Sequence, residues 1–164
     1  MFAQYQRRAV VLLVDDDPSI QTLFRYILHD VDIICADHGA DALLRLERIT
    51  PDLIISDIIM PVMDGVALLR MVRERPALAR IPFVLMSAIG DNLTMIESFH
   101  LGVDDYLVKP VSLALFRARI RAILNRPPVP SPLLGVDPQN TLLWPSAFTR
   151  AVERELAHLR PPQC

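Results

Sequence analysis

Cysteine is scarce in this sequence, which has only Cys35 and Cys164 among its 164 residues. Two cysteines at this spacing match neither a disulfide framework nor a metal-binding motif. The sequence therefore excludes a scaffold held together by disulfides. Cys35 lies within an apolar run, which favours a place in the core.

Long hydrophobic runs are lacking as well. The first apolar run, residues 9–14, is too short to span a membrane, and three aspartates follow it directly. The beginning of the chain shows no signal-peptide pattern. We therefore expect a cytoplasmic protein without a membrane partner.

An excess of one charge is the third absence. The chain carries 17 basic and 19 acidic residues, giving a net charge of -2. This balance does not support direct nucleic-acid binding, so we expect none. Lysine is almost missing, because every basic residue except Lys109 is an arginine. Its position raises the question whether that site requires a compact ammonium group.

The chain is organised around Asp57. Residues 53–56, Leu-Ile-Ile-Ser, form a short apolar run that predicts a buried strand ending at this aspartate. Pro61 predicts a turn, and Asp64-Gly65 predicts the start of a helix. A carboxylate at the end of a buried strand is costly unless a cation pairs with it. We therefore predict that Asp57 lies at the carboxyl edge of a central strand, where open α/β sheets bind ligands.

Short apolar runs alternate with helical patterns along the first three quarters of the chain. The apolar runs predict strands at residues 9–14, 31–36, 53–57, 82–86 and 106–108. The patterns after them predict helices at about residues 18–28, 40–49, 66–73, 91–101 and 112–124. This alternation predicts an α/β fold: a doubly wound, flavodoxin-like (βα)5 domain with a five-stranded parallel sheet.

Polar residues follow four of the predicted strands, at the point where each strand ends. They are Asp15 and Asp16, Asp57, Ser87 and Lys109. Because the carboxyl ends of parallel strands meet at one edge of the sheet, we expect these side chains to converge. Clustered carboxylates persist where a divalent cation compensates them, and oxygen ligands suit Mg²⁺, with Mn²⁺ also acceptable. We predict Asp16 and Asp57 as metal ligands and Asp15 as the partner of a metal-bound water.

Phosphoryl transfer fits this set of groups. A carboxylate beside Mg²⁺ can attack a phosphoryl group and become an aspartyl phosphate. The phosphoryl oxygens then need a cation and a hydroxyl, and Lys109 and Ser87 are residues of these types.

These motifs, in this order, resemble the receiver domain of two-component response regulators. The matching pieces, over about residues 9–125, are Asp15-Asp16, the stretch 57–65, Ser87-Ala88 and residues 105–110. The resemblance implies that Asp57 accepts phosphate from a phosphohistidine on a sensor histidine kinase or a phosphotransfer protein. It also implies that the backbone carbonyl of Ile59 binds Mg²⁺ together with Asp16 and Asp57.

The same resemblance implies a phosphorylation switch. Lys109 would pair first with Asp57 and then with the phosphate, and its peptide bond to the following proline is expected in the cis form. Ser87 would move to bond the phosphate, and Tyr106 would follow it inward. These movements would change the surface formed by the fourth helix, the fifth strand and the fifth helix. The resemblance also implies structural roles for three residues, Pro61, Gly65 and Pro110.

We expect a signalling domain and not a classical enzyme, with at most self-catalysed phosphotransfer. Ile59 and Ile89 stand at positions that flank the phosphate in receivers, and both are apolar. Neither side chain can orient a hydrolytic water, so the resemblance implies slow autodephosphorylation. The output would be control of a partner or a homodimer, formed through the switched surface or through a C-terminal helix.

Proline marks a change of composition after residue 126, where more than half of the 14 prolines lie. We predict a receiver domain at 1–126, a proline-rich linker at 127–145, and an amphipathic helix with a tail at 146–164. Residues 137–156 also resemble the opening of a GGDEF diguanylate cyclase domain, although the cyclase core is lacking. This segment could be a cyclase relic, a truncated piece of such a regulator or an unrelated helix. We expect no DNA-binding domain of ordinary size after the linker.

Two other functions compete with the phosphorylation switch. Residues 15–17 contain an Asp-x-Asp pattern that resembles the nucleophile motif of haloacid-dehalogenase-like phosphatases, in which the aspartate of the first strand is phosphorylated. The Asp57 motif with its Met-Pro turn argues against that interpretation. The other alternative is a receiver used only as a constitutive interaction module, and the intact Ser87 and Lys109 argue against it.

Overall fold

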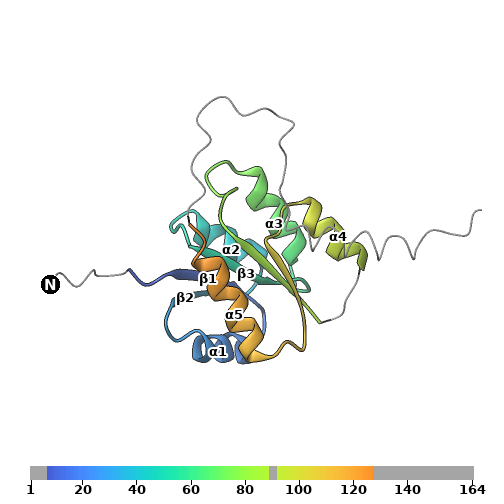
Figure 1. Ribbon diagram of the computed structural model, residues 1–164. Helices are drawn as coiled ribbons and strands as arrows, with labels where there is room; N and C mark the ends of the chain where they lie inside the picture. The colour runs from blue at the N-terminus through green and yellow to red at the C-terminus, as the bar shows by residue number, and fades with distance from the viewer. Residues whose placement is uncertain (1–6, 89–91, 128–164) are drawn as a thin grey trace, which may run out of the picture. The chain divides into compact units, whose positions relative to one another are not determined.

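The computed structural model describes residues 7–88 and 92–127, and these form one parallel sheet with helices on both faces (Figure 1). The chain divides into two units, Met1–Arg126 and Pro127–Cys164. Apart from Pro127, the predicted linker and C-terminal helix, and with them the GGDEF-like segment, lie outside the described residues. Within those residues, no helix has both the length and the apolar character needed to cross a membrane.

The five strands confirm the predicted sheet. They are β1 (Val10–Val14), β2 (Asp32–Ala36), β3 (Leu53–Asp57), β4 (Phe83–Ser87) and β5 (Asp105–Val108). All neighbours pair in parallel, in the order β2-β1-β3-β4-β5. The central strands β1, β3 and β4 are buried along almost their whole length, because helices cover both faces of a parallel sheet.

Five helices divide between the two faces of the sheet. They are α1 (Pro18–Ile27), α2 (Gly39–Leu46), α3 (Gly65–Glu74), α4 (Asn92–His100) and α5 (Leu113–Leu124). Helices α2, α3 and α4 pack on one face, and α1 and α5 pack on the other (Figure 1). Between α1 and α5, the rings of Phe24 and Phe116 stack with their centroids 4.7 Å apart. Successive side chains of each strand therefore point alternately into two separate hydrophobic cores.

Side-chain caps fix where four of the helices begin: α1, α2, α3 and α5. The Asp64 carboxylate accepts a hydrogen bond from the backbone N–H of Ala67 at 2.7 Å, and the Ser112 hydroxyl accepts one from Leu115 at 3.1 Å. Both caps lie where the sequence predicts helix starts. Helix α1 is capped by Asp17. Each such cap contributes about 1 kcal/mol to helix stability.

Some predicted boundaries were wrong, and two apolar helix residues lie exposed. Helix α2 ends at Leu46 and not near residue 49, because the chain tightens into a short turn before Pro51, which disfavours helix in the residue before it. Strand β4 extends to Ser87 and β5 begins at Asp105, one residue beyond each prediction. Leu23 and Leu44 fit the apolar periodicity of their helices, yet 39% and 63% of their surfaces are exposed.

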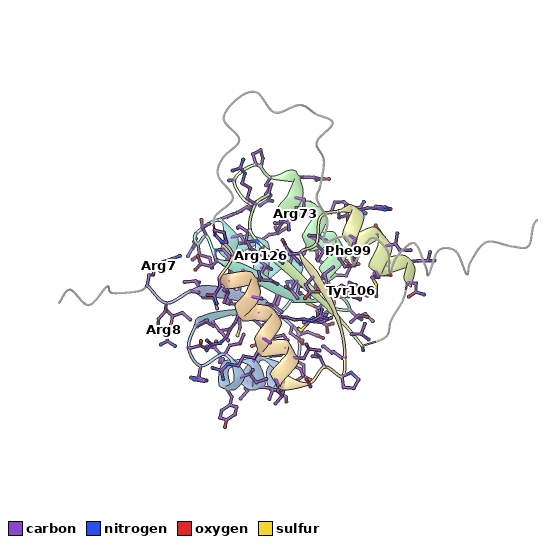
Figure 2. All side chains as sticks on the ribbon, in the orientation of Figure 1. Arg7, Arg8, Arg73, Phe99, Tyr106 and Arg126 are labelled. Atoms are coloured by element: carbon purple, nitrogen blue, oxygen red, sulfur yellow. The ribbon has the colours of Figure 1, made fainter. Side chains whose placement is uncertain are left out.

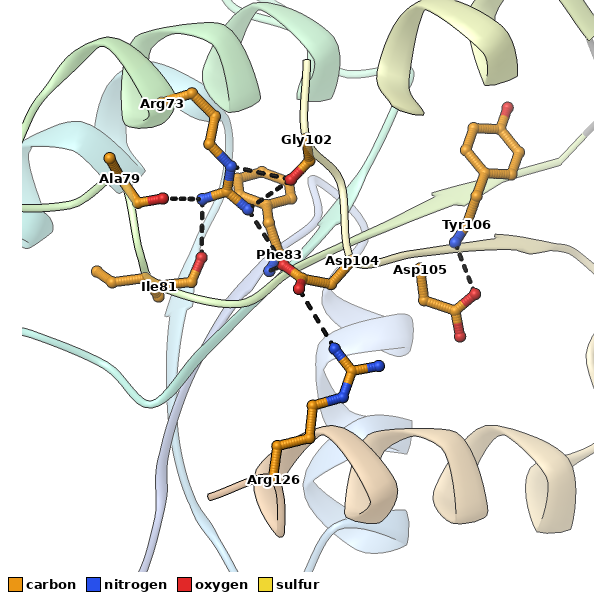
Figure 3. Close-up of polar contacts among 9 residues, drawn as sticks. All are labelled: Arg73, Ala79, Ile81, Phe83, Gly102, Asp104, Asp105, Tyr106 and Arg126. Atoms are coloured by element: carbon orange, nitrogen blue, oxygen red, sulfur yellow. Dashed lines mark hydrogen bonds and ion pairs between the residues drawn. The ribbon is translucent and has the colours of Figure 1, made fainter. Parts of the chain in front are cut away.

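Arg73 ties the end of α3 to the start of β5 (Figures 2 and 3). Its guanidinium donates to the carbonyls of Gly102 and Ile81, at 2.8 Å each, and forms an ion pair with Asp104 at 3.1 Å. The Asp104 carboxylate also accepts the backbone N–H of Phe83 at 2.8 Å. This cluster fastens the amino ends of β4 and β5, at the opposite end of the strands from the polar residues that the sequence singles out.

Candidate functional site

The carboxyl ends of β1 and β3 bring three aspartates together. These two strands are hydrogen-bonded neighbours, with Val14 opposite Ser56, so the residues that follow each strand emerge side by side. One carboxylate oxygen from each of Asp15, Asp16 and Asp57 lies within 4.8 Å of the others. The predicted convergence of these three acids is therefore present in the structure.

Asp15 is the buried member of the cluster, with only 1% of its surface exposed. One of its carboxylate oxygens accepts the backbone N–H of Asp17 at 2.9 Å. The other oxygen, Oδ2, is buried without a hydrogen-bond partner among the described residues. Burial raises the pKa of Asp15, and the Asp17 N–H and the Lys109 ammonium oppose that shift. The Lys109 ammonium, 3.6 Å from Oδ2, is therefore the one group among the described residues that offsets the charge on this oxygen.

A divalent cation fits this donor set. All the converging groups are carboxylates, and hard cations such as Mg²⁺ prefer oxygen ligands. The unpartnered Oδ2 of Asp15 supplies a further acceptor, suited to a water in the hydration shell that Mg²⁺ usually retains. The residues present thus match the cation that the sequence predicts.

Asp57 and Lys109 face each other across the same edge. The Lys109 ammonium lies 3.5 Å from Asp57 Oδ2 and 3.6 Å from Asp15 Oδ2, so one cation serves two acids. The other oxygen of Asp57 accepts the backbone N–H of Ile58 at 2.8 Å. The Asp57 side chain keeps 16% of its surface exposed, so solvent reaches it, unlike Asp15. This access favours Asp57 over Asp15 as a phosphoryl acceptor.

Lys109 is held by the end of β4. Its backbone N–H donates to the carbonyl of Ser87 at 2.7 Å, and its peptide bond to Pro110 is cis, which confirms that prediction. Ser87 is the last residue of β4 and is 6% exposed. The predicted hydroxyl and ammonium therefore come from the ends of the neighbouring strands β4 and β5, and β4 lies next to β3, which ends at Asp57.

Tyr106 lies on β5 with its ring turned into the protein. It is 7% exposed and packs against Phe99 of α4, with ring centroids 6.4 Å apart (Figure 2). Its hydroxyl has no hydrogen-bond partner among the described residues. The ring is therefore already inside the protein in this structure, and the movement of Tyr106 with Ser87 stays a prediction.

The loop between β3 and α3 packs closely against the end of β3, at Asp57. Gly65 donates its backbone N–H to the carbonyl of Ile58 at 2.8 Å. A Cβ atom at Gly65 would lie 2.1 Å from the carbonyl oxygen of Asp57, so no other residue fits without a backbone shift. Pro61 and Ile59 lie on the exposed side of the loop, and Ile59 is 72% exposed.

Residues 11–121 match the family model described as the response regulator receiver domain. The chain belongs to this family. Members are two-component signalling domains that are phosphorylated on an aspartate. The match covers four strands and four helices completely, together with most of β1 and α5, which agrees with the site at the carboxyl edge of the sheet.

Two curated relatives of the receiver are transcriptional regulatory proteins. The alkaline phosphatase synthesis transcriptional regulatory protein PhoP of Bacillus subtilis (strain 168) is 35% identical over 124 residues. The phosphate regulon transcriptional regulatory protein PhoB of Rhizobium meliloti (strain 1021) is 36% identical over 130 residues. These matches cover 74% and 76% of this chain, but only 51% and 56% of the relatives. The chain thus spans about half the length of the curated relatives it matches.

Solved structures show the same receiver fold. The chemotaxis response regulator CheY4 of Vibrio cholerae matches with a TM-score of 0.67 and 27% identity, over 71% of this chain and 99% of that one. The BeF3-activated receiver domain of Klebsiella pneumoniae RstA matches with a TM-score of 0.66 and 32% identity, over the same shares. The phosphatase alternative finds no support in these similarities.

Proposed function

We propose that this receiver takes a phosphoryl group onto Asp57 from a phosphohistidine of a sensor histidine kinase or a phosphotransfer protein. The observation that carries the proposal is the meeting of Asp15, Asp16 and Asp57 with the single lysine, Lys109, at one edge of the sheet. The proposal includes a cytoplasmic location, where kinases have access to ATP.

The transfer is a displacement at phosphorus. A carboxylate oxygen of Asp57 forms a new bond to phosphorus while the bond from phosphorus to the imidazole nitrogen breaks, and the released imidazole takes up a proton from water. Asp16, Asp57 and the backbone carbonyl of Ile59 would hold Mg²⁺, and Asp15 would hold one of its waters. When bound, the cation would offset the negative charge of the carboxylates and of the phosphoryl oxygens.

Lys109 and Ser87 act on the phosphoryl group in this proposal. The Lys109 ammonium, now 3.5 Å from Asp57, would pair with a phosphoryl oxygen, and the Ser87 hydroxyl would donate to another. The movement of Ser87, with Tyr106 following, would alter the surface of α4, β5 and α5. That surface would then bind a partner protein or a second copy of the chain.

Nucleic-acid binding stays open for the whole protein. The relatives are named transcriptional regulatory proteins, so the expectation of no direct nucleic-acid binding lacks support. The described residues carry no feature that favours a cyclase, and the proposal concerns the receiver alone.

Slow loss of the phosphoryl group is part of the proposal. The Ile59 side chain is apolar and exposed beside Asp57, so it offers no group that orients a hydrolytic water. Ile89, the other flanking position, lies outside the described residues. We expect the phosphorylated form to persist for minutes or longer after removal of the phosphodonor, and a lifetime of seconds would contradict this.

Binding of beryllofluoride, a phosphoryl mimic, tests the proposal without a kinase. We expect Mg²⁺-dependent beryllofluoride binding to the full chain by calorimetry, and none after Asp57→Asn. The matched control is Asp32→Asn, because Asp32 is an exposed aspartate at the opposite end of β2. Equal binding by the Asp57→Asn variant would refute Asp57 as the acceptor.

A further inference from the structure

Val62 adopts a backbone conformation that its side chain disfavours. Its φ is +68°, and no other non-glycine residue in the described part of the chain has a positive φ. Residues with branched Cβ atoms are the least suited to this region, which glycine and asparagine enter easily. The Val62 side chain is 82% exposed, so burial of its own methyl groups does not offset the strain.

The strain belongs to a three-residue turn. The backbone N–H of Met63 donates to the carbonyl of Pro61 at 2.8 Å, which closes a γ-turn around Val62. A γ-turn whose central residue has a positive φ is the rare and strained form of this turn. The loop between β3 and α3 therefore holds a high-energy bend near its middle.

Contacts on both sides of the bend hold it in place. Met63 accepts the backbone N–H of Gly39 through its carbonyl at 3.1 Å, and Ile58 donates its N–H to Met86 at 2.9 Å. Glycine makes these close approaches possible: a Cβ at Gly39 would lie 2.7 Å from the side chain of Met63, and one at Gly65 would strike the Asp57 carbonyl. Strain of this kind persists only where the surrounding structure over-determines the backbone, and it gathers at functional sites.

The segment held in this way carries Ile59, which lies between the fixed Ile58 and the γ-turn. A ligand group on a loose loop must be ordered when the ligand arrives, whereas a fixed loop avoids most of that entropy cost. We propose that Val62 is a positioning residue, whose strained γ-turn holds the Ile59 carbonyl ready for the divalent cation. This inference rests on the proposed metal site and deepens it.

Three substitutions of Val62 in the full chain distinguish the effect of the strained φ at Val62 from the effect of holding the loop in one conformation. Val62→Thr keeps the branched Cβ and should leave metal-free stability and Mg²⁺ affinity unchanged. Val62→Asn enters the same φ region readily, so it should raise the thermal midpoint of the metal-free protein by a few degrees and keep the Mg²⁺ affinity. Val62→Gly releases the loop and should weaken Mg²⁺ binding by about threefold to tenfold.

Calorimetric titration with Mg²⁺ and thermal unfolding in a metal chelator provide the two readouts. A weaker affinity for Val62→Gly together with a stabilised, tightly binding Val62→Asn supports the inference. Equal Mg²⁺ affinities for wild type and Val62→Gly, or a Val62→Asn variant no more stable than Val62→Thr, would overturn it alone. A wild-type chain that binds no Mg²⁺, or binds it equally after Asp57→Asn, would overturn the proposed metal site and this inference with it.

Discussion

At the scale of single residues, the buried Asp15 carboxylate lowers the free energy of unfolding when it is ionised. Its carboxyl is buried, and burial raises its pKa above the ordinary value of 3.8. The native state therefore holds this proton more tightly than the unfolded state does. As the pH rises from 3.8 through the raised native pKa, the free energy of unfolding falls, and the full cost is present above that pKa.

We predict that Asp15→Asn stabilises the metal-free protein at pH 7, by on the order of 1 kcal/mol. The gain should vanish in acid, where Asp15 is protonated in both states. Urea unfolding in a metal chelator at the two pH values measures it, with the exposed Asp32→Asn as the control that changes little. A less stable Asp15→Asn variant at pH 7 would contradict this account of the buried carboxylate.

Gly65 offers a second prediction at this scale. Gly65→Ala should lower the free energy of unfolding by at least about 2 kcal/mol and weaken Mg²⁺ binding, because its Cβ would displace the Asp57 backbone. Gly102→Ala is the control: Gly102 has a φ of +89°, but its Cβ would meet only the Arg73 side chain at 3.4 Å. That variant should lose stability and keep its Mg²⁺ affinity.

The sequence predicted which residue types form the site, but it did not predict the backbone conformation around them. Asp15, Asp57 and Lys109 could be named because each follows an apolar strand, and parallel strands deliver their ends to one edge. The strained φ of Val62 could not be foreseen, since contacts with distant segments impose it against the local preference of valine. The contact of Gly39 with Met63, which holds the loop, could not be predicted for the same reason.

At the scale of elements, Arg73 shows how one side chain joins segments far apart in the sequence (Figure 3). Its side chain is only 17% exposed, and its guanidinium spans the end of α3, the loop before β4 and the loop before β5. Burial lowers the pKa of Arg73, and Asp104 opposes the shift. Loss of this guanidinium would remove the donor to the carbonyls of Ala79, Ile81 and Gly102 and one ion pair of Asp104.

We predict that Arg73→Ala costs about 2–4 kcal/mol of stability. Arg73→Lys should recover only part of the loss, because an ammonium cannot match the planar fork of a guanidinium. The control is Arg70→Ala, on the same helix: Arg70 pairs with Glu97 at 2.7 Å, but about half of each side chain is exposed. That pair should contribute less than about 1 kcal/mol. Similar losses for Arg70→Ala and Arg73→Ala in urea unfolding would contradict the assigned role.

Element order followed from the sequence, while some element ends did not. Apolar runs and caps such as Asp64 and Ser112 are local signals, so strands and helix starts could be read directly. The end of α2 depends on how the chain turns toward Pro51, and the exposure of Leu44 depends on what packs beside it. Arg73 carried no sequence signal, because its partners lie on two loops that are far apart in the sequence.

At the scale of the described domain, two hydrophobic cores cover the two faces of one sheet, and the acidic site lies at the carboxyl edge of that sheet. The acids at that edge repel one another without a cation, so metal binding should couple to global stability. At a Mg²⁺ concentration one hundred times its dissociation constant, we predict a gain of about 2.7 kcal/mol. Asp32→Asn should show the same gain and Asp16→Asn a much smaller one. Thermal unfolding at increasing Mg²⁺ measures it, and equal shifts in all three proteins would contradict the assigned site.

The central claim is that Asp57 is the phosphoryl acceptor of this receiver. The most direct measurement is the intact mass of the full chain after incubation with acetyl phosphate and Mg²⁺. The account predicts a mass gain of one phosphoryl group in the wild type and in Asp32→Asn, and none in Asp57→Asn or in the presence of a chelator. A folded, Mg²⁺-binding wild type that gains no phosphoryl group, or an Asp57→Asn variant that gains one, would contradict it.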